Sequence, residues 1–302
     1  MDRTVTTVID AAKCIGCGLC VKVCPYGTIS MRDKKAVVSG DRSMSCGHCA
    51  AACPTGAIRV HAIDGESARF ATFTADDMWL PHGEYDTAQL VRLMGSRRSC
   101  RNYTDRPVDR VLLDDLVKIG VTAPSGTNSQ LWTFTILPTR KAVLKLGERF
   151  ATFFEKLNRI SENRYLRYFL KLIGKRELDK YFRDQHDSVE QALAEWENSR
   201  IDRLFHGATA LIIVGSKPEA SCPKEDALLA TQNILLAAHS MGLGTCLIGY
   251  AVEAMKHDIE IRSFLGIPDD EKVYSVIALG YPDEKYQRTA GRKKYVQRYY
   301  EA

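Results

Sequence analysis

The stretch Cys14-Ile-Gly-Cys17-Gly-Leu-Cys20-Val-Lys-Val-Cys24-Pro25 places four cysteines at the spacing C-x2-C-x2-C-x3-C-P. Three thiolates in such a tight, glycine-containing loop can hold three irons of one cubane, and the fourth cysteine then ligates a second cluster. Zinc takes four ligands, so a structural zinc ion has no use for the seven cysteines that fall within residues 14–53. The stretch therefore predicts iron–sulfur ligation.

A second half follows at a constant offset. Three of the four cysteines recur 29 residues later, as the pairs Cys17 and Cys46, Cys20 and Cys49, and Cys24 and Cys53. A fixed offset of this kind indicates a duplicated module. The same offset carries Cys14 onto Ser43, so the second half lacks one expected thiol.

Residues 1–62 resemble the bacterial two-[4Fe-4S] ferredoxin domain. Its crossed ligation implies that the first cluster is held by Cys14, Cys17, Cys20 and Cys53. The second cluster would keep three cysteines, Cys24, Cys46 and Cys49. Three outcomes are open for this second site: a [4Fe-4S] cluster with Ser43 or another oxygen as its fourth ligand, a [3Fe-4S] cluster, or no cluster. Some cluster is favoured, because three thiolates outweigh one weak fourth ligand.

Composition limits the class of protein. A chain of 302 residues suggests about two domains, and its apolar fraction of 45% and charged fraction of 26% are ordinary for a folded soluble protein. The net charge of +5 is too small to imply binding to nucleic acid. No stretch is apolar and long enough for a membrane span, and the first residues lack a secretory pattern. We therefore expect a cytoplasmic protein.

The remaining cysteines, Cys100, Cys222 and Cys246, are scattered, and we expect them to behave as small apolar residues. Residues 63–84 mix glycine, proline and acidic residues with short apolar runs, which is typical of a connector. A second domain is expected over residues 85–302.

The second domain opens with a helical pattern from Thr87 that ends in Arg97-Arg98-Ser99-Cys100-Arg101. Guanidinium groups present forked donors that match two phosphate oxygens, so this segment suits a phosphate. A cluster of arginines is also typical of a solvated basic surface. The segment alone leaves both interpretations open.

A polar loop follows the next expected helix, with the sequence Ala123-Pro-Ser-Gly-Thr-Asn-Ser-Gln-Leu-Trp132. It leads into an expected strand over residues 131–137. Its amides are available to hydrogen-bond a heteroaromatic ring, although an ordinary turn uses the same residue types.

Together the patterns Arg-Arg-Ser-x-Arg and Ala-Pro-Ser-x-x-Asn-x-Gln-x-Trp resemble the FMN-binding core of the nitroreductase family. An apolar helix over residues 226–241, a strand end at 248–250 and a strand over 273–279 with a basic tail fit the same family. The resemblance spans about residues 85–145 and 205–302. It implies an α+β sandwich, placed after the duplicated ferredoxin-like domain, that forms a homodimer with one FMN at each of two inter-subunit sites.

The resemblance also implies the residues of the flavin site. The ribityl chain and phosphate would be held by Arg97, Arg98, Ser99, Arg101 and the tail residue Arg292. The flavin ring would be bordered from the other subunit or side by Pro124, Ser125, Asn128 and Gln130. The strand end at Ile248 and Gly249 would approach the ring. Cys100 departs from the usual apolar residue or threonine, and we expect it to pack beneath the site.

A helical insert is expected at about residues 146–205, because this segment is longer than the family core requires. Leu166, Phe169, Leu170 and Ile173 fall on one helical face, so the simpler interpretation is a packed face with solvated Lys and Arg. A sharper interpretation is a lid over the flavin, which would leave Tyr165, Tyr168, Tyr181 or Arg183 to contact substrate. A membrane-surface or partner-binding helix has weaker support.

These features predict an FMN- and iron–sulfur-dependent oxidoreductase. Clusters pass single electrons, whereas FMN can store two. The donor would be reduced ferredoxin, flavodoxin or another reductase, and the acceptor a nitroaromatic, quinone, activated alkene or halogenated aromatic. No Rossmann fingerprint indicates a dedicated NAD(P)H site, although nitroreductases can bind nicotinamide directly over FMN. The alternative is a redox relay or sensor that passes electrons to a protein partner; an open pocket above the flavin favours the enzyme.

Overall fold

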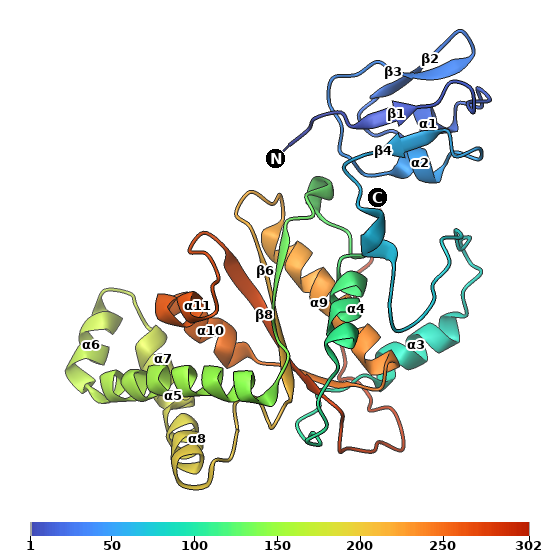
Figure 1. The fold of residues 1–302 in the computed structure, drawn as a ribbon. Coiled ribbons are helices and arrows are strands. Elements are labelled where there is room, and N and C mark those ends of the chain that lie inside the picture. Colours follow the sequence, from blue (N-terminus) through green and yellow to red (C-terminus); the bar gives the residue numbers. More distant parts are fainter. Residues whose placement is uncertain (1, 302) are drawn as a thin grey trace.

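The computed structural model describes residues 2–301. A small N-terminal region carries two two-stranded sheets, and a larger region is built on one four-stranded sheet (Figure 1). The limits that we predicted for the domains, 1–62 and 85–302, stay a prediction. No helix within residues 2–301 is both long and apolar enough to cross a membrane.

The N-terminal region repeats one backbone unit. Its elements are β1 (Thr7–Ile9), α1 (Leu19–Lys22), β2 (Ile29–Arg32), β3 (Lys35–Val38), α2 (His48–Ala51) and β4 (Ile58–Val60). Strand β1 pairs antiparallel with β4, and β2 pairs antiparallel with β3. Both short helices begin after a glycine in the left-handed region, Gly18 and Gly47, each with φ of 74°. These glycines have the same spacing as the cysteines, so the duplication extends to the backbone.

The segment after β4 is fastened to the second region. It contains the short helix η1 (Gly65–Ala68) and ends at α3 (Thr87–Ser96). Asp115, fully buried on α4 (Arg110–Gly120), accepts hydrogen bonds from the backbone N–H groups of Ala71 and Thr72 at 3.0 and 2.7 Å. Burial acts to raise the pKa of Asp115, but the hydrogen bonds from Thr72 and Ala71 outweigh it and lower that pKa. The expected connector is therefore anchored to α4.

The four-stranded sheet has the antiparallel order β5-β6-β8-β7. Its strands are β5 (Trp132–Leu137), β6 (Ala210–Ser216), β7 (Gly244–Leu247) and β8 (Lys272–Gly280). Every residue of β6 is buried, and its side chains alternate between two apolar cores. Leu211 and Ile213 join one core, whereas Ile212 and Val214 join the other. Helices therefore cover both faces, which confirms the predicted α+β sandwich.

Helices α4 and α9 (Pro223–Ser240) cover one face of the sheet, and α5 (Arg140–Glu162), α10 (Gly249–His257) and α11 (Ile259–Phe264) cover the other (Figure 1). Helix α9 begins at Pro223, three residues before the expected Asp226, because proline fits the first turn of a helix. Its end at Ser240 is followed by Gly242, whose φ of 81° is typical of a helix C-terminus.

The expected insert is helical, and its first helix, α5, begins earlier than predicted. Three further helices follow: α6 (Arg164–Leu172), α7 (Glu177–Asp184) and α8 (His186–Ser199). On α6 the expected packed face is only half formed, because Leu166 and Leu170 are half-buried but Phe169 is 58% exposed. Just beyond α6, Ile173 is exposed as well. Helix α6 lies at the far end of the molecule from the N-terminal region (Figure 1).

Candidate functional site

The seven N-terminal cysteines gather around two small cavities. Cys14, Cys17, Cys20 and Cys53 line one of them. Cys24, Cys46 and Cys49 line the other, together with Ser43. The last cysteine of each run thus crosses to the other cavity, in the same grouping that the ferredoxin resemblance implied. One four-thiol and one three-thiol donor set fit the ligation of two iron–sulfur clusters.

Backbone N–H groups point at the sulfur atoms of the first cavity. The N–H of Ala36 donates to Cys14 Sγ at 3.4 Å, and that of Ala57 donates to Cys53 Sγ at 3.2 Å. The first bond is the main cause that lowers the pKa of Cys14. For Cys53, burial acts to raise the pKa, but hydrogen bonds from Thr55 and the neighbouring backbone lower it overall. These contacts favour the thiolate, which is the form that ligates metals.

Ser43 lies in the second cavity at the place of the missing thiol. Its side chain is buried, and its Oγ accepts the N–H of Ser45 at 3.0 Å. At the equivalent place in the first half, the backbone N–H of Gly16 helps to lower the pKa of Cys14. Ser45 also takes the left-handed conformation of Gly16, with φ of 51° against 72°. The second half therefore keeps the loop geometry of the first and replaces only the sulfur by an oxygen.

The arginine segment runs from the end of α3 to the edge strand β7. Ser99 forms an isolated bridge with Thr245 of β7, and the N–H of Cys100 donates to Thr245 O at 2.9 Å. Cys100 is buried against Gly244, which is the packing we expected, and burial raises its pKa to about 11. It is therefore a protonated thiol at neutral pH.

Arg97 and Arg98 present positive charge without a carboxylate partner. Both side chains are half-buried, and among residues 2–301 neither forms an ion pair. Burial, together with the charges of Arg98 and Arg292, lowers the pKa of Arg97, so the three guanidiniums lie within electrostatic reach of one another. Uncompensated, half-buried guanidiniums fit a phosphate group.

A large cavity adjoins this segment. It lies between helices α5, α7 and α10 and the end of β7. Its volume of about 1050 Å³ is ample for a heteroaromatic cofactor and a small substrate. Of the residues predicted for the flavin site, Arg101, Ile248 and Gly249 line it. His206 also lines it, and burial and the charge of Arg101 lower the pKa of this imidazole.

Only one of the four predicted substrate contacts lines the large cavity. That residue is Tyr181, whose hydroxyl donates to Asn158 Oδ1 at 2.6 Å. Tyr165 and Tyr168 stand on the exposed side of α6 and are 71% and 65% exposed. Arg183 lies 3.5 Å from the carboxylate of Asp179 on the surface of α7.

The polar loop is organised by Asp226, a residue for which the sequence pattern predicted only a helix start. Its buried carboxylate accepts the N–H of Gly126 at 2.8 Å and the hydroxyl of Ser129 at 3.0 Å. The loop contains the short helix η2 (Gly126–Asn128). Within it, Ser125 Oγ accepts the N–H of Gln130 at 3.1 Å, and Pro124 is exposed.

Asn128 and Gln130 connect this loop to the N-terminal region. Asn128 Nδ2 donates to the carbonyls of Met44 and Ser45 at 3.0 and 3.3 Å. Gln130 Nε2 donates to Asn128 Oδ1 at 2.8 Å and so orients the amide. The polar loop therefore contacts the segment that lines the second cysteine cavity, a contact that sequence reasoning did not predict.

One chain does not bring the two halves of the predicted flavin site together. The polar loop is bonded to Asp226 near the start of α9, whereas Ser99 and Cys100 pair with β7, which follows the end of α9. Helix α9 has 18 residues, a length of about 27 Å at the standard helical rise. The arginine segment and the polar loop lie at opposite ends of this helix.

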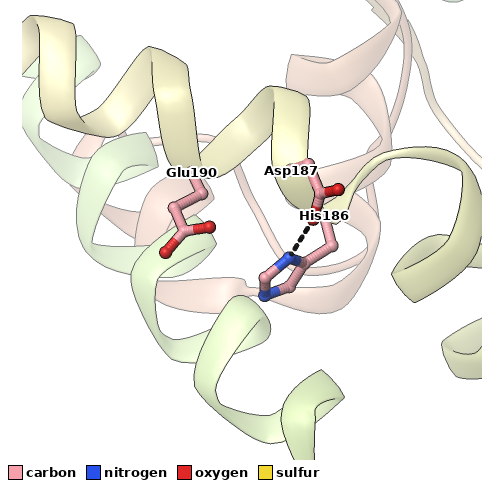
Figure 2. Close-up of side chains that lie close together, drawn as sticks. All are labelled: His186, Asp187 and Glu190. Atoms are coloured by element: carbon pink, nitrogen blue, oxygen red, sulfur yellow. Dashed lines mark hydrogen bonds and ion pairs between the residues drawn. The ribbon is translucent and has the colours of Figure 1, made fainter.

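A further cluster lies outside these sites. Figure 2 shows His186, Asp187 and Glu190 on α8, whose ligand atoms all lie within 4.8 Å of one another. His186 Nδ1 lies 2.9 Å from Asp187 Oδ1, and Nε2 lies 3.5 Å from Glu162. The hydrogen bond to Asp187 is the main cause that raises the pKa of His186. With a carboxylate oxygen near each ring nitrogen, His186 takes part in an ion-pair network.

Comparison with known proteins identifies the larger region. Residues 94–281 match the model of the nitroreductase family, and residues 13–57 match that of the 4Fe-4S dicluster domain. The chain belongs to the nitroreductase family. It is therefore an oxidoreductase of the nitroreductase type, with a ferredoxin-type iron–sulfur region at its N-terminus.

Several known proteins match about two thirds of this chain. A protein of Archaeoglobus fulgidus named "Putative NADH dehydrogenase/NAD(P)H nitroreductase" is 29% identical over 65% of this chain and 88% of its own length. The 4-nitrobenzoate reductase of Pseudomonas putida is 26% identical over 66% of this chain and 87% of its own length. A solved nitroreductase with bound FMN from Bacteroides fragilis is 25% identical, covers 69% of this chain and 99% of its own, and has a TM-score of 0.49.

Proposed function

We propose that this nitroreductase uses FMN to reduce a small organic acceptor with electrons that enter through its N-terminal cysteines. The observation that carries the proposal is the direct contact of Asn128 with Met44 and Ser45. It joins the second cysteine cavity to the polar loop that the family resemblance assigns to the flavin. Neither a nitroreductase without iron nor an isolated ferredoxin would need this junction.

The residues around each site indicate which of them would hold the two clusters and the FMN. Four thiolates would hold the first cluster, and Cys24, Cys46, Cys49 and Ser43 would hold the second. Arg97, Arg98, Ser99, Arg101 and Arg292 would bind the phosphate and ribityl chain of FMN, with Ile248 and Gly249 beside the ring. Bound FMN would accept electrons singly and deliver two of them to the acceptor.

We further propose that the active unit is a homodimer. The polar loop and the arginine segment are separated by the length of α9 within one chain, so a second copy is needed to complete the flavin site. Pro124, Ser125, Asn128 and Gln130 of one copy would border the ring held by the other. The exposed positions of Pro124 and Gln130 leave them accessible to such a partner.

The large cavity favours a small aromatic acceptor over a relay to a protein partner. Phe153, Phe154 and Tyr250 supply aromatic walls, Lys180 supplies a cation, and the imidazole of His206 supplies a hydrogen-bonding group. This lining suits a planar ring that carries an acidic or nitro group, such as a nitroaromatic carboxylate or a halogenated phenol. The names of two relatives agree with that class: the 4-nitrobenzoate reductase of Pseudomonas putida, and iodotyrosine deiodinase 1 of Rattus norvegicus, which is 24% identical over 64% of this chain and 62% of its own length. Of the predicted substrate contacts, Tyr181 is best placed.

The proposal is tested on protein purified without oxygen. We expect about eight irons and one FMN per chain if both cavities hold [4Fe-4S] clusters, and about seven irons if the Ser43 site holds a [3Fe-4S] cluster. The protein should reduce a nitroaromatic carboxylate with reduced ferredoxin as the donor and turn over more slowly with NADH. A variant Cys46→Ala that keeps its FMN should lose ferredoxin-driven turnover. Protein without flavin, or ferredoxin-driven turnover unchanged in Cys46→Ala, would overturn the proposal.

A further inference from the structure

The junction between the N-terminal region and the polar loop is held on both sides. Arg3 donates to the carbonyl and hydroxyl oxygens of Thr127 at 3.1 and 3.0 Å, next to the bonds from Asn128 to Met44 and Ser45. Thr127, Asn128 and Gln130 all have positive φ, between 50° and 56°. Such backbone is strained in residues other than glycine and persists only where surrounding contacts hold it.

This fixed junction places the second cysteine cavity near the start of α9. The arginine segment of the same chain lies at the other end of that helix, which is about 27 Å long at the standard helical rise. Electron tunnelling weakens steeply with distance. A cluster in this cavity is therefore poorly placed to reduce an FMN that is held by the arginine segment of its own chain. A swing of the whole N-terminal region would have to break the bonds made by Arg3 and Asn128.

We propose that the N-terminal region of each chain delivers electrons to the flavin site of the partner chain. The loop that Asn128 holds against Ser45 is also the loop that completes the partner's flavin site, so the same contact serves both functions. The inference rests on the proposed function, because it needs FMN between two copies. For each two-electron reduction of the acceptor, two molecules of a one-electron donor such as reduced ferredoxin are oxidised, and protons come from solvent.

Mixed dimers with two different affinity tags test the direction of delivery. In the first dimer, one chain carries Arg97→Ala and Arg98→Ala, and the other carries Cys46→Ala and Cys49→Ala. The single FMN is then bound by the arginines of one chain, whereas the intact cysteines belong to the other chain. In the second dimer, one chain carries all four substitutions and the other is unchanged, so the single FMN and the intact cysteines share one chain. FMN and iron contents are measured for both dimers before use.

The readout is the rate at which flavin absorbance is lost after anaerobic mixing with reduced ferredoxin, without any acceptor. Delivery between chains predicts that the first dimer reduces its FMN at close to the rate of the unsubstituted protein. The second dimer should be slower by about tenfold or more, the effect of raising the barrier by about 1.4 kcal/mol. Fast reduction in the second dimer, whether or not the first is also fast, would overturn the inference, as would a monomeric protein.

The outcomes separate this inference from the proposed function. If the unsubstituted homodimer lacks FMN or is not reduced by ferredoxin, the proposed function itself fails. If it is reduced and only the second mixed dimer is fast, the function stands and delivery is within one chain. If the double cysteine substitution also removes the first cluster, Cys46→Ser alone takes its place in both dimers.

Discussion

Single residues distinguish the two cysteine cavities. The loops around Cys14 and Ser43 share a left-handed residue two positions further on, Gly16 and Ser45, so the exchange of sulfur for oxygen is the main difference between them. An oxygen ligand is harder than a thiolate and holds iron less firmly. The variant Ser43→Cys should therefore raise iron retention at the second site and change the paramagnetic signal of the reduced protein. Ser39→Cys, at an exposed serine that lines neither cavity, is the control. An unchanged signal in Ser43→Cys would show that residue 43 does not face a cluster.

Arg98 carries a second prediction at the residue scale. Its guanidinium is half-buried near Arg97, and loss of a charged hydrogen bond to phosphate costs about 1.5–3 kcal/mol. The variant Arg98→Ala should thus weaken FMN binding by about tenfold or more, measured by flavin fluorescence, with iron content unchanged. Arg92→Ala, an exposed arginine on α3, is the matched control. Equal FMN affinity in both variants would remove Arg98 from the phosphate site.

At the scale of elements, Asp115 ties the segment after β4 to α4. Its pKa is lowered in the folded protein, so its contribution to stability is complete above its unfolded pKa of about 3.9 and is lost as pH falls through the folded value. Asp115→Asn should reduce the free energy of unfolding by about 1–3 kcal/mol at pH 7, with a smaller reduction near pH 3. Anaerobic urea unfolding at both pH values measures this. If the difference in unfolding free energy between the two proteins did not change with pH, the role of the ionised carboxylate would be contradicted.

Much of the element structure could be predicted from the sequence, because it follows from local periodicity. The strands ending at Leu137 and Gly280 and the glycine after α9 lie within a residue or two of their predicted places. The predicted packed face on α6 was only half correct, since periodicity cannot tell which apolar face has a partner. The role of Asp226 was missed because a buried carboxylate that orders a loop about 100 residues away leaves no local pattern.

At the scale of the whole molecule, the junction between the two regions is the feature that the sequence could not supply. The ferredoxin resemblance implied the grouping of the thiols that the two cavities show, and the arginine motif led to the phosphate site that we propose. The contact of Asn128 with Met44 depends on how two separately recognisable regions meet. Because the Asn128 amide binds backbone carbonyls, which every residue has, the contact leaves no pattern in the sequence around Met44.

Arg3 provides a test of this junction, because it is not among the residues proposed to hold a cofactor. Arg3→Ala removes two hydrogen bonds to Thr127 and should loosen the docking of the N-terminal region. We expect unchanged iron and FMN contents but slower reduction of the flavin by reduced ferredoxin, by about threefold to tenfold. Arg59→Ala removes the same charge from an exposed position on β4 and should have no effect. Equal rates in the two variants would mean that the Arg3 contact does not control delivery.

The most direct test of electron flow compares flavin reduction in the unsubstituted protein and in Cys46→Ala at equal FMN content. Both are mixed anaerobically with reduced ferredoxin, and flavin and cluster absorbance are followed together. If electrons reach the flavin through clusters in the cysteine cavities, the flavin absorbance of the unsubstituted protein will fall together with the absorbance change of its clusters. In Cys46→Ala the flavin absorbance will fall far more slowly. The same rate of flavin reduction in both proteins would contradict delivery through the second cavity.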